Sequence, residues 1–155
     1  MGANQIDGEG NQNISAIGDH SRPGKQLLGV RGGPGNTANH RTSYWVPRHS
    51  KRVFVDQVDV VSGVGHARAR EAELRHHDVH RVVTNLGVLD FGGGGHAPRL
   101  LSVHPGVSVD EVVEATSFPL LTDGVTESRL PTESELLLIR SSLDPKSLRD
   151  KEVPS

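Results

Sequence analysis

The chain contains no cysteine, and only 3% of its 155 residues are aromatic. The absence of cysteine excludes a disulfide framework, a thiol nucleophile, and zinc or iron–sulfur sites built on cysteine. A formal net charge of −2 argues against nucleic acid as a partner, because phosphate neutralisation requires a basic surplus. No apolar run approaches the ~18 residues of a membrane span. We therefore expect a soluble, cytoplasmic protein that binds neither nucleic acid nor membrane.

The apolar residues that are present are aliphatic and unevenly distributed. Leu, Ile, Val and Phe together form about a quarter of the chain, above the ~20% below which disorder is expected. Residues 1–50 are rich in Gly, Asn, His and Arg, and residues 52–143 hold nearly all of the strand and helix signals. The first segment is therefore expected to depend on other material for its burial.

Three valine- and leucine-rich runs predict strands. Residues 52–61 alternate with a period of two and one phase slip, residues 80–91 are rich in β-branched side chains and are followed by four glycines, and residues 100–103 stop at a Pro-Gly pair. Residues 5–7 and 14–17 flank a Gly-Glu-Gly-Asn segment, which predicts the tip of a hairpin.

Two capping boxes predict helices after these strands. Ser108 and Glu111 open a helix that extends to Ala115, and Thr132 and Glu135 open one that ends before Asp144-Pro145. Residues 146–155 are charged and predict a loose tail. Strands followed by capped helices indicate an α/β fold.

A glycine-rich stretch at residues 29–35 is the first candidate for chemistry. Its backbone can approach a ligand closely, and its amides could bind a phosphate or stabilise an oxyanion. No Gly-Lys-Ser/Thr follows, so it is not a P-loop. On its own, such a stretch is more often an ordinary turn.

Two further candidates have simpler interpretations. His76, His77 and His80 could supply metal ligands. However, His76 and His80 share a face only on a helix, whereas this segment predicts a turn before a strand. Glu9 lies in a Gly-Glu-Gly turn and could act as a nucleophile, but most exposed turn glutamates have no chemical role.

Four segments in order carry a more specific signal: residues 5–13 (QIDGEGNQN), the pair Gly32 and Gly33, residues 83–91 (VTNLGVLDF) and residues 101–112 (LSVHPGVSVDEV). Together they resemble the β subunit of family I coenzyme A transferases, in particular the glutaconate CoA-transferase and steroid ring-opening CoA hydrolase groups. The HPGV stretch that leads into VDEV is the most specific part. The resemblance extends from Gln5 to about Glu152.

This resemblance implies an open α/β sheet of the CoA-transferase type with C-terminal capped helices. It also implies an active site at the junction with a CoA-transferase α subunit. In the family a glutamate carboxylate attacks an acyl-CoA thioester, and a glycine loop stabilises the oxyanion. Gly32 and Gly33 match that loop, and Gly35, Asn36 and Gln5 match neighbouring substrate-binding positions. The resemblance implies coenzyme A as part of the substrate, with no resident cofactor and no metal.

The sequence also departs from the family pattern. The family's β subunit is longer on its N-terminal side, where the Glu-x-Gly nucleophile motif of ordinary transferases lies. Glu9 does not replace that motif, because the family has an aromatic residue in this turn. In the ring-opening group, which residues 14–33 favour slightly, the acting glutamate belongs to the partner subunit. We therefore expect an N-terminally incomplete domain over residues 1–145 and a charged tail over residues 146–155.

Three hypotheses about function follow. The leading one is a β-subunit segment acting on acyl-CoA thioesters, by CoA transfer or ring-opening hydrolysis, together with an α subunit. The second is a non-catalytic truncated remnant or partner-binding module. The third is a histidine-dependent metalloprotein.

Overall fold

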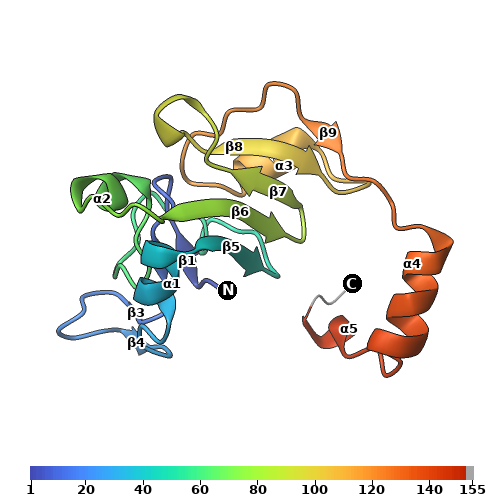
Figure 1. The fold of residues 1–155 in the computed structure, drawn as a ribbon, viewed down its shortest axis with the longest axis horizontal. Coiled ribbons are helices and arrows are strands. Elements are labelled where there is room, and N and C mark those ends of the chain that lie inside the picture. The colour runs from blue at the N-terminus through green and yellow to red at the C-terminus, as the bar shows by residue number, and fades with distance from the viewer. Residues whose placement is uncertain (153–155) are drawn as a thin grey trace.

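A five-stranded sheet of order β5-β6-β7-β8-β9 forms the centre of the protein in a computed structural model, which describes residues 1–152 (Figure 1). The pairs β5–β6 and β8–β9 are parallel, and the two pairs between them are antiparallel. The elements in chain order are β1 (Gln5–Ile6), β2 (Gln12–Asn13), β3 (Ala16–Ile17), β4 (Lys25–Gln26), α1 (Gly33–Asn39), β5 (Arg41–Val46), α2 (His66–Glu71), β6 (Asp78–Thr84), β7 (Gly87–Asp90), the 3₁₀ turn η1 (Gly94–His96), β8 (Arg99–Val103), α3 (Val109–Glu114), β9 (Thr126–Glu127), α4 (Glu133–Leu138), the π-helical turn η2 (Ile139–Leu143) and α5 (Arg149–Glu152).

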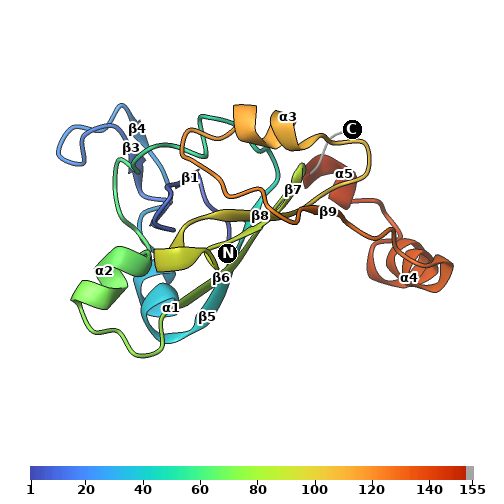
Figure 2. The same cartoon turned by 90° about the horizontal axis from the view of Figure 1, so that it is seen from above.

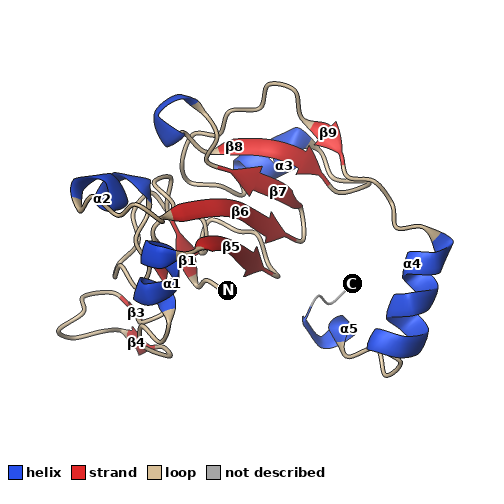
Figure 3. Ribbon diagram, viewed as in Figure 1, coloured by secondary structure: helices blue, strands red, loops and turns tan. Residues whose placement is uncertain are grey.

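One face of this sheet carries the core. Along β5 the side chains of Thr42, Tyr44 and Val46 are buried and alternate with exposed ones, as expected for a strand covered on one side. The β1–β2 hairpin, residues 53–55 and α3 lie against this face (Figures 2 and 3). The buried cluster consists of Ile6, Tyr44, Val46, Phe54, Val79, Val82, Leu89, Phe91, Leu100 and Val112. The expectation of an α/β fold with an open sheet is confirmed.

The opposite face of the sheet is less covered. Trp45 pairs with Val83, and Val83 pairs with Val88, so these three side chains form one row across three strands. Val83 and Val88 are half-buried, and Trp45 is 39% exposed. We call this row the outer sheet face.

The strand predicted at residues 52–61 is wrong. Phe54 makes only an isolated bridge to Ile6 in β1, although Val53 O and Val55 N–H bond the backbone of Ile6 at 2.7 and 3.0 Å. Beyond Val55, side chains take the place of the backbone groups of a neighbouring strand as hydrogen-bond partners. For example, Asp59 N–H donates to Gln5 Oε1 at 3.0 Å. Of the five valines in this run only Val58 is buried, and the other four are half-buried, without a ladder.

The single strand predicted at residues 80–91 is also wrong, because the run folds into the hairpin β6–β7. Asn85 and Leu86 form the turn, and Thr84 Oγ1 accepts the N–H groups of Leu86 and Gly87 at 3.0 and 3.1 Å. A Cβ on Gly87 would clash with the carbonyl oxygen of Ser102 in β8, so only glycine fits there. The strand predicted at residues 100–103 is confirmed as β8.

The hairpin tip is confirmed at Gly8–Gly10, but its second limb is β2 rather than residues 14–17. Both predicted helix starts are confirmed. Ser108 accepts Glu111 N–H at the start of α3, and Thr132 and Glu135 form a reciprocal capping box at the start of α4. The helix from Thr132 ends at Asp144, as predicted.

Residues 129–152 form an arm that leaves the sheet after β9 (Figures 1 and 2). We call this segment the C-terminal arm. Of the tail predicted at residues 146–155, the last four residues of the described part form α5, and residues 153–155 lie outside it. Among residues 1–152, no helix combines the length and apolar character that crossing a membrane requires.

Candidate functional site

The glycine-rich stretch forms the start of a helix rather than the open loop that the sequence predicts. Gly32 is the N-cap of α1, Gly33 is its first residue, and Pro34 occupies the first turn. Proline is favoured there because its missing N–H would have had no partner within the helix. The three residues before this helix still form a loop, with φ of +80° at Gly29 and +47° at Arg31.

Close packing behind the helix start explains why residue 33 is glycine. A Cβ at Gly33 would lie 2.9 Å from Ser62 O and 3.3 Å from Gln12 Oε1. The buried Thr37 side chain holds the same turn, because its Oγ1 donates to Gly33 O at 2.8 Å and accepts Val64 N–H at 3.0 Å. The start of α1 is therefore fixed against β2 and residues 62–64.

The amides of the two matched glycines have different partners. Gly33 N–H donates to Val30 O at 2.9 Å, which closes a turn. Gly32 N–H has no acceptor among residues 1–152. Asn36 lies one turn further along, where its N–H donates to Gly32 O at 3.0 Å and its side-chain Nδ2 approaches the open side of Gly32. The Asn36 side-chain amide thus lies on the side of Gly32 where a Cβ would be, and it donates to Met1 Sδ at 3.3 Å.

The other predicted site residues lie in different surroundings. Gly35 is exposed, and a Cβ there would contact nothing within 4 Å. Gln5 is buried in β1, where its Oε1 accepts from Asn13 Nδ2 at 2.7 Å and from Asp59 N–H, and its Nε2 donates to Asp59 Oδ2 at 3.0 Å. Gln5 therefore supports the hairpin behind the glycine stretch.

The rim of the glycine stretch is apolar and open. Leu28 and Val30 are 67% and 46% exposed, and Arg31 beside them is also exposed. Asn36 borders a separate hollow of about 240 Å³ together with Met1, His40 and Arg41. Exposed apolar side chains next to a free backbone amide are typical of a site that another surface completes.

A cluster of three histidines lies behind the same helix. His77 Nδ1–H donates to Thr37 O at 2.7 Å, and His77 Nε2 lies 3.2 Å from His66 Nδ1. The His96 ring stacks on His66 with 4.3 Å between centroids. Burial, together with the charges of His96 and His77, lowers the pKa of His66 to about 4, so this ring is neutral near neutral pH. His66 Nε2 is buried without a partner in the described chain.

This histidine cluster differs from the one that the sequence suggested. His76 is exposed, and His80 lies in β6, as the strand predicted from residue 80 implies. No three His, Asp or Glu side chains within residues 1–152 are arranged so that they could hold a metal ion. The metalloprotein hypothesis therefore has no structural support.

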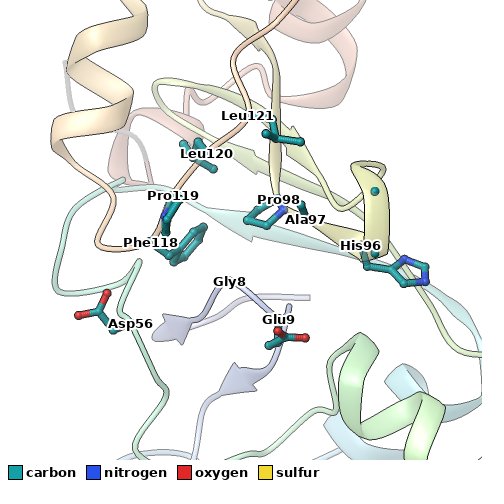
Figure 4. Close-up of a pocket in the computed structure, with 12 residues that line it drawn as sticks. Gly8, Glu9, Asp56, His96, Ala97, Pro98, Phe118, Pro119, Leu120 and Leu121 are labelled. Carbon is teal, nitrogen blue, oxygen red and sulfur yellow. The ribbon is translucent and has the colours of Figure 1, made fainter.

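A cavity of about 440 Å³ lies on the other side of the β1–β2 turn (Figure 4). Its walls are mainly apolar, and Glu9, Asp56 and His96 lie around it. None of the five site residues matched to the family lines it. The rest of its lining consists of Gly8, Gly94, Gly95, Ala97, Pro98, Phe118, Pro119, Leu120 and Leu121. The sequence signal for this cavity was weak, because its apolar residues come from two irregular segments, at residues 97–98 and 118–121.

Comparison with known proteins places this arrangement in a family. Residues 1–115 match the coenzyme A transferase family. The chain is 56% identical over 158 residues to the cholesterol ring-cleaving hydrolase IpdB subunit of Mycobacterium tuberculosis, which covers 100% of the chain and 63% of that relative. The chain therefore spans less than two thirds of that relative's length.

Two crystal structures share the fold. The structure of Rhodococcus jostii RHA1 IpdAB superposes with a TM-score of 0.93 and 55% identity, covering 100% of this chain and 64% of that one. Glutaconate coenzyme A-transferase from Acidaminococcus fermentans gives a TM-score of 0.86 and 30% identity, covering 94% of this chain and 57% of that one. With the match over residues 1–115, these similarities show that the chain belongs to the coenzyme A transferase family.

Proposed function

We propose that this chain supplies the β-subunit part of an enzyme that acts on acyl-CoA thioesters together with an α-type subunit. The names of the relatives support two reactions, CoA transfer and ring-opening hydrolysis. The 56% identity to a ring-cleaving hydrolase subunit favours the second. Coenzyme A enters as part of the substrate, and the proposal includes no resident cofactor. It also includes a cytoplasmic location, which rests on the sequence alone.

The observation that carries this proposal is the free N–H of Gly32 at an exposed apolar rim. When a nucleophile attacks a thioester, the carbonyl oxygen becomes negatively charged. A fixed N–H that points at this oxygen stabilises the transition state more than the ground state. Gly32 is suited to this role because its own carbonyl and the following turn are fixed by hydrogen bonds, so little reorganisation is needed.

The other matched residues then have distinct roles. Gly33 allows the close approach to Ser62 that fixes the turn, and its N–H is already used by Val30 O. Asn36 offers a second amide donor beside Gly32. Gly35 keeps the next exposed position free of a side chain. Gln5 acts from behind, through the hydrogen bonds that hold the β1–β2 hairpin.

The test compares two substitutions at one position. G32A and G32P both add carbon atoms, but only proline removes the N–H. The φ of Gly32 is −85°, which is close to the range of proline. In a mixture with the A subunit of Rhodococcus jostii IpdAB, we expect G32P to turn over acyl-CoA substrates at least ~10²-fold more slowly than G32A, as for other lost oxyanion donors.

Two outcomes would contradict the proposal. Equal turnover by G32A and G32P, with both variants folded and bound to the A subunit, would exclude the Gly32 N–H as a donor. No gain in turnover when the unchanged chain is added to the A subunit would favour the alternative, a partner-binding module without chemistry. The exposed apolar rim at Leu28 and Val30 fits that alternative equally well, so turnover is the deciding measurement.

A further inference from the structure

Helix α1, which begins at the proposed oxyanion donor, is poorly stabilised by its own sequence. Its seven residues are GPGNTAN, and glycine, proline and asparagine are among the weaker helix formers. Isolated helices shorter than about 12 residues are marginal even with favourable sequences. Contacts from elsewhere in the chain therefore determine where α1 lies, and with it where the Gly32 N–H points.

Within residues 1–152, three hydrogen bonds from distant segments hold α1. Val64 N–H donates to Thr37 Oγ1 at 3.0 Å, and His77 Nδ1–H donates to Thr37 O at 2.7 Å. The third is the bond from Asn36 Nδ2 to Met1 Sδ at 3.3 Å. Thr37 is fully buried and takes part in two of the three bonds. It is therefore the residue at which the rest of the fold holds this helix.

Thr37 transmits this restraint to the start of the helix. Its Oγ1 donates to Gly33 O at 2.8 Å. The N–H of the neighbouring Asn36 donates to Gly32 O at 3.0 Å. The carbonyl of Thr37 lies in the last turn of α1, where helical carbonyls lack partners within the helix, and His77 supplies one. Both ends of α1 are thus fixed through Thr37.

The His77 ring is itself held in one state. Because Thr37 O can only accept, His77 Nδ1 carries a proton. The Nε2 of the neutral ring then accepts from His66 Nδ1–H, with 3.2 Å between the two nitrogens. Burial lowers the pKa of His66 to about 4, so this ring is neutral and its single proton is the one donated to His77. His66 Nε2 is left as a buried acceptor without a partner in the described chain, which folded proteins rarely tolerate.

The far end of this series of bonds is fixed at the β1–β2 turn. His66 N–H donates to Glu9 O at 2.8 Å. A Cβ at Gly65 would clash with the same carbonyl oxygen, so only glycine allows this contact. The bonds therefore run from the Glu9 carbonyl through His66 and His77 to α1, and they join the β1–β2 turn to the glycine stretch.

We propose that His77 is a positioning residue for the reaction: acting through Thr37, it fixes the direction in which the Gly32 N–H points. This inference rests on the function proposed above, and it adds a residue that lies outside the four segments that resemble the family. Displacing a reacting or stabilising group by about 1 Å can cost ~10²-fold in rate. Loosening α1 is therefore expected to slow the chemical step without weakening substrate binding.

Two substitutions at position 77 separate the N–H donor from the bulk of the ring. H77N places an amide N–H near the position of Nδ1, whereas H77L fills the space without a donor. H76L, at an exposed histidine, is the control. With the A subunit of Rhodococcus jostii IpdAB and an acyl-CoA substrate, we expect H77L to lower kcat about tenfold and to leave KM within about twofold. H77N is expected to retain kcat within about threefold, and H76L within about twofold.

Hydrogen exchange of the chain alone measures the restraint without any turnover. The Asn36 N–H, which is bonded to Gly32 O, is expected to exchange about fivefold faster in H77L, because α1 opens more often. In H77N and H76L its exchange is expected to stay within about twofold of the unchanged chain. Circular dichroism and the melting temperature establish that each variant is folded.

The outcomes separate this inference from the function proposed above. If H77N is as slow as H77L, the N–H donated to Thr37 is not the feature that matters, and this inference is overturned. An unchanged kcat in H77L, a raised KM in place of a lowered kcat, or slow turnover without faster exchange at Asn36 also overturns it. A difference between G32A and G32P would still support the Gly32 donor in each of these cases. Equal turnover by G32A and G32P excludes that donor, and this inference with it, even if H77L accelerates exchange in α1.

Discussion

The carboxylate of Asp90 receives two hydrogen bonds from Arg99, from Nε to Oδ1 at 2.9 Å and from Nη2 to Oδ2 at 2.8 Å. The two residues are direct cross-strand partners in β7 and β8. Arg81 of β6 adds a third bond at 3.1 Å. Burial of Asp90 raises its pKa, but the bonds from Arg99 and from Gly92 N–H outweigh burial, and the net pKa is lowered.

The two parallel hydrogen bonds from Arg99 to Asp90 predict that two arginine-to-lysine substitutions differ in their effect on stability. R99K replaces two parallel bonds by a single point charge, and we expect it to reduce the free energy of unfolding by about 1 kcal/mol. R41K alters the exposed pair with Asp78 and is expected to change it by less than about 0.5 kcal/mol. Urea unfolding of both variants measures the difference. Equal effects would show that the two-bond Arg99–Asp90 pair contributes no more to stability than the exposed Arg41–Asp78 pair.

The buried His49 predicts a loss of stability in mild acid. Its ring stacks on Phe54 with 3.7 Å between centroids, its Nε2 lies 2.9 Å from Thr116 Oγ1, and burial lowers its pKa to about 4. Because this pKa lies below the unfolded value of about 6.5, protonation favours the unfolded chain. The contribution of His49 to the free energy of unfolding is therefore fully present above about pH 6.5 and is lost as the pH falls toward 4. His66 contributes in the same sense.

Substitution of His49 isolates its share of this pH dependence. Between about pH 6.5 and 4, H49Q is expected to remove roughly half of the decline in the free energy of unfolding. This share amounts to at most about 3 kcal/mol. H76Q, at an exposed histidine, is the control and should leave the profile unchanged. Urea unfolding at a series of pH values gives the measurement, and an unaltered slope in H49Q would show that His49 is not the group that titrates.

Two glycines of the same helix are expected to respond in opposite ways to alanine. G33A forces a Cβ to within 2.9 Å of Ser62 O, and we expect a loss of about 1–3 kcal/mol. G35A meets nothing within 4 Å and should stabilise the helix by about 0.5–1 kcal/mol. Thermal unfolding of the two variants distinguishes them. A stable G33A would mean that residues 62–63 move away easily.

The cap of α4 predicts a local rather than a global effect. T132A removes the acceptor of Glu135 N–H, a change that costs about 1 kcal/mol at other helix starts. We expect amide hydrogen exchange to accelerate about fivefold across residues 133–138, with the melting temperature of the sheet unchanged. T122A, at an exposed threonine outside any helix, is the control. Unchanged exchange in T132A would show that the Arg129–Glu135 pair alone holds this end.

The sequence predicted the elements that depend on local chemistry. The capping residues Ser108 and Thr132 predicted both helix starts, because a cap acts within three residues of its partner. The turns at Gly8–Gly10 and after β8 were predicted for the same reason. The strand at residues 52–61 was wrong because residues 53–55 make only a short bridge to β1, and beyond it side chains such as Gln5 take the place of a ladder partner. Strand β5 was missed, since its partner β6 lies more than 30 residues away.

The candidate site was predictable by position but not by role. The glycine pair was found through its resemblance to a family, and nothing in the sequence distinguished Gly32 from Gly33. That difference arises from Ser62, Gln12 and Val30, which contact the pair only after folding. The apolar cavity beside Glu9 was not predicted either, because its walls come from four separate segments without a common pattern.

Trp45 on the outer sheet face is the only tryptophan of the chain and is partly exposed there. Its indole emission therefore reports on whatever lies against that face, without any added dye. The buried side of the sheet holds no tryptophan, so repacking of the core contributes no indole signal of its own. A shift of this emission to shorter wavelength on titration with another protein would measure how the outer sheet face becomes occupied, in real time and on the unmodified chain.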